Sequence, residues 1–245
     1  MTLRDVRIRY KQALMGFGWA VFMPTLIVLS GVLVRLAVAN VGGRALATAS
    51  VAEIAVKAIP WGFVVGALSF ATTSLTGNGT LVSKIYFPRE VLPLSAVLAS
   101  AFDALIGSAV VLAALVFLGV TPAATQVWVL PIALLTFALT VAAALFVSCA
   151  NLFFRDVKYI VQVFLTFGIF FTPVFFDPAM FGPRGAKLLM LNPVAPLLEG
   201  LRLSVVHGHD LLLPLVVTAR GVPIVAWEPW YLAYSATWAI GGLVA

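Results

Sequence analysis

Few side chains in this sequence are of the kinds that catalyse reactions or bind cofactors. The run His207-Gly208-His209-Asp210 has the composition of a metal site, but without other ligands nearby we expect no metal there. The run Gly77-Asn78-Gly79-Thr80 lacks the lysine of a phosphate-binding loop, and no complete motif of that kind occurs elsewhere. The single cysteine, Cys149, cannot form an intrachain disulfide. We therefore predict a protein that is not an enzyme, with no catalytic residue, cofactor or metal of its own.

A short charged segment between two apolar runs is the most unusual feature of the chain. It begins at Gly77 and Gly79 and is broken by Pro88, and both residue types interrupt helices. We expect an elbow at the membrane surface here. Its charges could simply cap two spans, or its aromatic and charged side chains could form a docking surface for a soluble subunit. The candidate docking residues are Lys84, Tyr86, Phe87, Arg89 and Glu90.

The composition indicates a membrane protein. Apolar residues make up 62% of the chain and charged residues 10%, whereas globular proteins have roughly 25% charged residues. Several uncharged runs approach or exceed the roughly 20 residues that cross a bilayer as a helix. We predict one all-α, polytopic domain over residues 1–245. Its six expected spans are 17–38, 58–76, 91–118, 126–150, 159–176 and 229–245, the last of them truncated by the end of the sequence.

The orientation follows from the positive charges of the short loops. Lys and Arg are more frequent before the first expected span, after the second and after the fourth than in the first two loops on the other side. Such a bias marks the cytoplasmic side, so we expect a cytoplasmic N-terminus. Because these charges lie at the ends of spans and not on one basic face, we expect no binding of nucleic acid.

Residues 3–16 have the pattern of an amphipathic helix. Apolar side chains such as Val6 and Tyr10 recur at steps of three and four residues, while Arg4, Arg7 and Lys11 fall on another face. We expect this helix to lie in the membrane interface with its basic side toward lipid phosphates or a partner.

Four segments, in this order, resemble the membrane subunit of ATP-binding-cassette exporters for polysaccharides, O-antigens, capsules and teichoic acids. RDVRIRYKQALMGFGWAVFMP (Arg4–Pro24) resembles the entry helix of that family, and GNGTLVSKIYFPREVLPLSAV (Gly77–Val97) its cytoplasmic coupling elbow. NLFFRDVKYIVQVFLTFGIFFTPVFF (Asn151–Phe176) resembles its second cytoplasmic loop and fifth span, and LNPVAPLLEGLR (Leu191–Arg202) its extracytoplasmic segment.

The resemblance implies a permease of the bacterial inner membrane that exports a lipid-linked polysaccharide. It implies a second copy of the chain, with the pore between the copies. It also implies two separate ATPase subunits that hold ATP and Mg and act through the cytoplasmic elbows. Arg155 and Asp156 would support the docking residues, although they could equally be an ordinary ion pair at the end of a span.

Aromatic rings suit the flat C–H faces of sugars, and the resemblance favours a pore lined by phenylalanines of the fifth span. Phenylalanine stripes in membrane helices also pack against neighbouring helices or lipid, so both interpretations stay open. A carboxylate near mid-span is costly, and Asp103 could line the pore, pair with another helix or be protonated. The candidate pore residues are Phe164, Phe167, Phe171, Phe175 and Asp103.

The segment Asp177–Glu228 contains too many prolines for one simple span. We expect it to form short re-entrant helices on the outer side, with a candidate outer gate. Arg35 lies near the outer end of the first span, and we expect its side chain to snorkel to the interface. The candidate gate residues are Asn192, Pro193, Glu199 and Arg202.

Two other functions are compatible with six spans. A permease that exports drugs or small lipids would share the same plan. An ion-coupled secondary transporter would call for ionisable residues at midplane on several helices, and often for inverted repeats. The sequence offers Asp103 and no repeat, so we rank that class lower.

Overall fold

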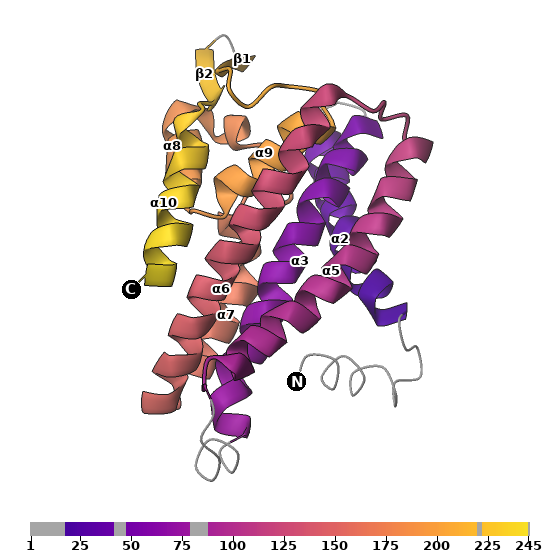
Figure 1. Cartoon of the computed structure of the whole chain (residues 1–245). Helices are drawn as coiled ribbons and strands as arrows, with labels where there is room; N and C mark the ends of the chain where they lie inside the picture. Colours follow the sequence, from indigo (N-terminus) through magenta and orange to yellow (C-terminus); the bar gives the residue numbers. More distant parts are fainter. Residues whose placement is uncertain (1–17, 42–47, 79–87, 220–221, 245) are drawn as a thin grey trace.

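The computed structural model describes residues 18–41, 48–78, 88–219 and 222–244. These residues form a bundle of long helices with short elements gathered at one end (Figure 1). The helices that run along the bundle are α2 (Gly18–Val41), α3 (Thr48–Gly77), α5 (Val91–Phe117), α6 (Val129–Phe153), α7 (Val157–Phe171) and α10 (Trp230–Val244).

The predicted class of an apolar helical protein is confirmed. Among the described residues, Ala49–Gly77, Val91–Phe117 and Ala124–Phe153 are long and apolar enough to cross a membrane. Thr25–Asn40 and Val157–Phe171 are apolar but shorter. The number of six spans therefore stays a prediction, although a helix occupies each of the six expected places.

Two helices differ in extent from the expected spans because of charge and proline. The expected span 58–76 begins after the charged Lys57, whereas α3 begins at Thr48 and includes Glu53 and Lys57. These two charges are buried and paired, so the helix continues through them. The fifth helix ends earlier than expected, at Phe171, because Pro173 cannot continue a helix.

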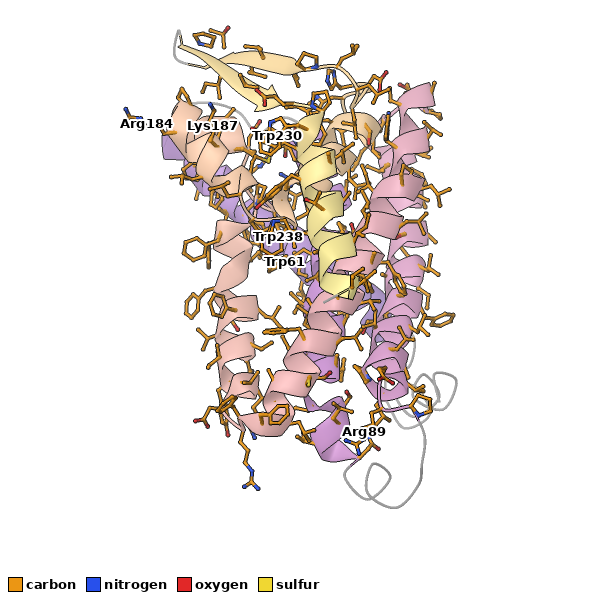
Figure 2. The ribbon with its side chains drawn as sticks, turned by 60° about the vertical axis from the view of Figure 1, so that its left-hand side comes forward. Trp61, Arg89, Arg184, Lys187, Trp230 and Trp238 are labelled. Atoms are coloured by element: carbon orange, nitrogen blue, oxygen red, sulfur yellow. The ribbon has the colours of Figure 1, made fainter. Side chains whose placement is uncertain are left out.

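The prediction of an all-α chain missed one small sheet. Strands β1 (Leu215–Ala219) and β2 (Val222–Trp227) pair antiparallel, with Val216 opposite Val225. They lie beside η1 (Ala124–Trp128), η2 (Pro178–Phe181), α8 (Gly182–Met190) and α9 (Ala195–Val205) at one end of the bundle (Figure 1). We call this the strand end. Arg89 lies at the opposite end, the Arg89 end (Figure 2).

Helix α3 is central, because it contacts α2, α5, α6, α7 and α9. Small residues let it approach its neighbours closely. Ala67 and Ala71 pack in one cluster with Ala96 of α5 and Ala144 of α6, as is common between membrane helices. The position of α3 brings its own charged side chains under α9 at the strand end.

Candidate functional site

Helix α9 is buried along its whole length at the strand end. Its 11 residues are too few to cross a bilayer, and it packs on α3, α6 and α10. The short helices η2 and α8 precede it, and α8 begins at Gly182 and Pro183, with the proline near its first turn, where a missing N–H costs least. The expected short helices are therefore present in this part of the chain, and their re-entrant character stays a prediction.

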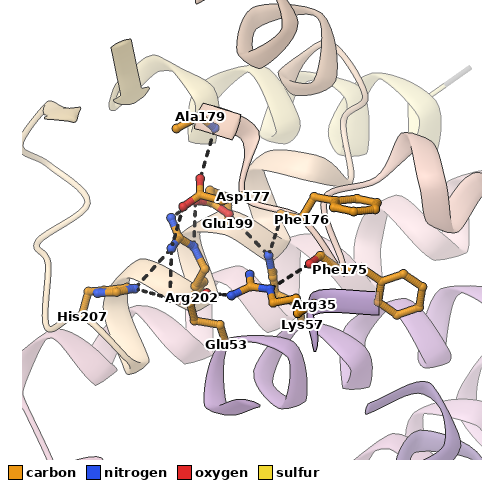
Figure 3. Close-up of polar contacts among 10 residues, drawn as sticks. All are labelled: Arg35, Glu53, Lys57, Phe175, Phe176, Asp177, Ala179, Glu199, Arg202 and His207. Carbon is orange, nitrogen blue, oxygen red and sulfur yellow. Dashed lines mark hydrogen bonds and ion pairs between the residues drawn. The ribbon is translucent and has the colours of Figure 1, made fainter. Parts of the chain in front are cut away.

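Seven ionisable side chains from three helices and their connections meet beneath α9. Figure 3 shows them with their polar contacts. They come from α2, from α3, from the segment after α7, from α9 and from the turn after α9. We call them the charge network, and its members are Arg35, Glu53, Lys57, Asp177, Glu199, Arg202 and His207.

Glu53 lies at the centre of one half of the charge network. Arg35 Nη1 donates to Glu53 Oε2 at 2.6 Å, and Arg202 Nη1 approaches Glu53 Oε1 at 3.4 Å. The ring nitrogen Nε2 of His207 lies 3.0 Å from the same Oε1. One carboxylate thus joins α2, α3 and α9.

Arg202 is the centre of the other half. Its Nε donates to Glu199 Oε1 at 2.8 Å, and its Nη2 also bonds that oxygen. Its Nη1 lies 3.4 Å from Asp177 Oδ2. Burial opposes its charged form, but the carboxylates of Glu199, Asp177 and Glu53 outweigh this, so the pKa of Arg202 lies above its ordinary value. Arg202 is therefore a permanent cation.

The cations of α2 and α3 also hold the segment that follows α7. Lys57 Nζ donates to the carbonyl oxygen of Phe176 at 3.1 Å, and Arg35 Nε donates to that of Phe175 at 2.9 Å. The side chains of Lys57 and Glu199 are both 0% exposed, with Nζ and Oε2 3.9 Å apart. Backbone carbonyls that no helix satisfies thus find donors within the charge network.

Charge balance explains how these groups can be buried. Leaving His207 aside, the network has three cations, on Arg35, Lys57 and Arg202, and three carboxylates. Isolated buried charges are very costly, whereas paired and hydrogen-bonded ones are tolerated. The charge network therefore fixes α9 and the segment after α7 to α2 and α3, and a movement of α9 away from α3 would have to separate Arg202 from Glu53.

The structure corrects the expectation for Arg35. Its side chain does not snorkel: the residue is 8% exposed and bonds Glu53 and Phe175. The physical reason is that α3 presents a carboxylate to it inside the bundle. Sequence reasoning also missed Glu53, Lys57, Asp177 and His207. The available signal was the spacing of four between Glu53 and Lys57, which puts both charges on one face of a helix.

The four predicted gate residues all lie at the strand end, but they do not form a single group of contacts. Glu199 and Arg202 belong to the charge network. Asn192 donates through Nδ2 to Thr172 Oγ1 at 2.9 Å, and the carbonyl of Pro193 accepts from Ser235 Oγ at 2.8 Å. Asn192 and Pro193 thus connect the end of α7 with α10.

The histidine-rich turn after α9 is divided among separate partners. His207 joins the charge network, His209 Nε2 lies 3.0 Å from the carbonyl oxygen of Leu213, and Asp210 accepts from Trp128 Nε1 at 3.1 Å. The turn holds η1 and the residues just before β1 in place.

The predicted pore residues separate into two groups. Phe164, Phe167 and Phe171 are 73%, 57% and 70% exposed on α7, whereas Phe175 is 4% exposed. The inclusion of Phe175 in a pore-lining stripe is therefore a wrong prediction. The helix ends before it, and its ring packs in a core cluster with Ile54, Val174 and Leu198. Asp103 is half-buried in α5.

Part of the predicted docking surface lies at the Arg89 end. Arg89 and Glu90 form the exposed turn before α5, and Arg155 and Asp156 form the exposed turn between α6 and α7. Two sets of predicted residues lie outside the described residues: Lys84, Tyr86 and Phe87 of the elbow, and Arg4, Arg7, Tyr10 and Lys11 of the N-terminal helix.

Comparison with known proteins links this arrangement to a family of permeases. Residues 1–206 match the membrane family described as "ABC-2 type transporter". An O-antigen export system permease protein RfbA of Klebsiella pneumoniae is 25% identical over 209 residues, which cover 85% of this chain and 79% of that protein. A protein of the same name from Myxococcus xanthus is 25% identical over 233 residues, covering 93% and 87% of the two chains.

Proposed function

Since the match over residues 1–206 shows that the chain belongs to the ABC-2 type transporter family, we propose that it exports a lipid-linked polysaccharide across the bacterial inner membrane. Members of this family are non-catalytic permease subunits. We base the choice of cargo on the similarity to O-antigen export permeases, which extends over 85% and 93% of this chain.

Family membership implies a partner ATPase, and we propose two such subunits for two copies of this chain. ATP and Mg would be bound by the ATPase, because this sequence has no phosphate-binding loop. Under the proposed orientation the N-terminus and the Arg89 end face the cytoplasm. The exposure of Arg89, Glu90, Arg155 and Asp156 supports an ATPase-docking surface there, together with Lys84, Tyr86 and Phe87.

The cargo would pass between the two copies, along α7. The exposed rings of Phe164, Phe167 and Phe171 support this route, because they form an apolar aromatic face that no described part of the same chain covers. Glu199 and Arg202 would hold the outer gate closed through the charge network. We propose no role in binding cargo for Phe175, which is buried.

Export of drugs or small lipids is the second candidate, because the family match alone does not fix the cargo. The family match removes the support for ion-coupled secondary transport. To decide between the two cargo classes, the permease and its ATPase are reconstituted in vesicles and ATP hydrolysis is measured with each kind of substrate. We expect stimulation by lipid-linked polysaccharide. Stimulation by small drugs and none by the glycolipid would overturn the proposal.

A further inference from the structure

A cavity of about 380 Å³ lies between α3 and α7. It is formed by the last turns of α3 and the first turns of α7, so it lies toward the Arg89 end, away from the charge network. Its polar lining comes from Ser69, Thr72 and Thr73 on α3 and from Lys158, Tyr159 and Gln162 on α7. This concentration of polar groups stands out between two apolar helices.

Lys158 gives the cavity a positive charge. Its ammonium lies 4.7 Å from the ring centroid of Tyr159, and it forms no ion pair with any described residue. Among the described residues that line the cavity there is no Asp or Glu. An anion that entered the cavity would therefore be attracted by Lys158 and would meet no carboxylate of this described lining.

Apart from Thr72, the neutral polar groups of the lining are free to donate hydrogen bonds. The hydroxyl of Thr72 also lines the cavity, but it is buried and donates to the carbonyl of Leu68 at 2.6 Å. The exposed hydroxyls of Ser69 and Thr73 and the amide of Gln162 have no such partner among the described residues. An ammonium, two hydroxyls and an amide offer the donors that a phosphate group accepts from.

The position of the cavity indicates where such a phosphate would come from. Lys158 lies in the first turn of α7, and Val161 and Leu165 continue the lining along the helix. Along α7 the lining runs from the charged Lys158 to the apolar Leu165 over two turns, about 10 Å at the usual rise of an α-helix, with Gln162 between them. An anionic phospholipid has its groups in the same order, with a charged headgroup followed by an alkyl chain. Basic pockets between membrane helices bind such headgroups.

We propose that this cavity, which we call the α3–α7 pocket, binds the phosphate group of an anionic lipid from the leaflet at the Arg89 end. Lys158 neutralises the phosphate, Ser69, Thr73 and Gln162 donate to its oxygens, and Val161 and Leu165 contact the first part of the alkyl chain. This goes beyond the proposed function, because the pocket requires only that the chain lies in a membrane and does not depend on which polymer is exported.

The test measures binding of three probes to the purified full chain in detergent micelles, by native mass spectrometry. The probes are phosphatidic acid, diacylglycerol with the same alkyl chains, and inorganic phosphate. We expect phosphatidic acid to bind more tightly than diacylglycerol. We expect Lys158→Gln to weaken its binding about tenfold, which corresponds to about 1.4 kcal/mol. The matched control is Lys187→Gln, which changes an exposed lysine at the strand end (Figure 2).

A second variant, Ser69→Ala combined with Thr73→Val, removes the two hydroxyls and keeps Lys158. We expect it to weaken phosphatidic acid binding as well, because donors are lost without a change in charge. Equal binding of phosphatidic acid to Lys158→Gln and Lys187→Gln would overturn the proposal. If inorganic phosphate competes at the concentration at which phosphatidic acid binds, the pocket recognises free phosphate, and the lipid assignment is wrong. Neither result depends on the cargo assay in vesicles.

Discussion

Glu53 of α3 and Arg202 of α9 are 149 residues apart in the chain, and their side chains approach to 3.4 Å inside the strand end. Both are almost fully buried. Their contact connects the central helix of the bundle to the short buried helix α9 that covers it. Since Arg35 and His207 contact the same carboxylate, the position of α9 relative to α2 and α3 depends on Glu53.

Replacing Glu53 with Gln should destabilise the protein strongly. The change keeps the shape of the side chain but leaves Arg35 and Arg202 with one carboxylate fewer in a buried site. Removing one partner of a buried ion pair typically costs about 3–5 kcal/mol. The measurement is the unfolding midpoint of the purified protein in detergent. Glu90→Gln, at an exposed site, is the control, and a midpoint shift as small as that of the control would contradict the assigned role of Glu53.

Glu199→Gln should destabilise the protein more than Lys57→Met does. Glu199 is the carboxylate nearest to Lys57, at 3.9 Å, and it also bonds Arg202. Its neutralisation leaves the buried ammonium with the carbonyl of Phe176 alone. Removing Lys57 instead leaves Glu199 paired with Arg202. Unfolding midpoints of the two variants, measured side by side, check the order, and the reverse order would show that Lys57 depends on another group.

The sequence alone predicts where the long helices lie, but it does not predict the charge network. Apolar runs place α5 and α6 within a few residues, because a bilayer sets the length of a span. The network could not be predicted, because it joins residues such as Arg35 and Asp177 that only the tertiary structure brings together. Charges usually mark the ends of spans, and on that assumption the expected second span begins after Lys57 and leaves out Glu53 and Lys57. The same assumption led to the wrong expectation for Arg35.

The hairpin of β1 and β2 was missed for a related reason. Its sequence, Leu215–Trp227, is mostly apolar and rich in β-branched residues, but it lies within the segment for which short re-entrant helices are expected. The structure shows that Trp227 ends β2 as a fully buried side chain whose Nε1 donates to the carbonyl of Leu211 at 3.0 Å. A tryptophan that anchors a hairpin from inside the core is not distinguishable by composition from one at a membrane interface.

Charge reversal at the Arg89 end should weaken the complex with the ATPase. We expect Arg89→Glu and Glu90→Lys each to reduce the amount of ATPase that copurifies with the permease by several-fold, because both side chains are exposed on the proposed docking surface. The permease should still insert and unfold at its normal temperature. Both quantities are read from the same detergent extract by affinity purification and thermal denaturation.

The matched controls for this prediction lie at the strand end. Arg184→Glu and Lys187→Glu reverse exposed charges of the same kind far from Arg89 (Figure 2). They should leave the recovery of ATPase unchanged. If the ATPase were lost from the Arg184→Glu complex and kept in the Arg89→Glu complex, the proposed orientation of the chain would be wrong.

Two phenylalanines near the end of α7 should respond to alanine in opposite ways. Phe175 is packed in the core, so Phe175→Ala should cost about 3–5 kcal/mol of stability. Phe167 is 57% exposed, and surface substitutions usually change stability by about 0.5 kcal/mol or less. If Phe167 contacts the cargo, Phe167→Ala should lower polysaccharide export several-fold at normal stability. Phe146→Ala, at an exposed ring on α6, should change neither quantity, and unchanged export by Phe167→Ala would argue that α7 faces lipid.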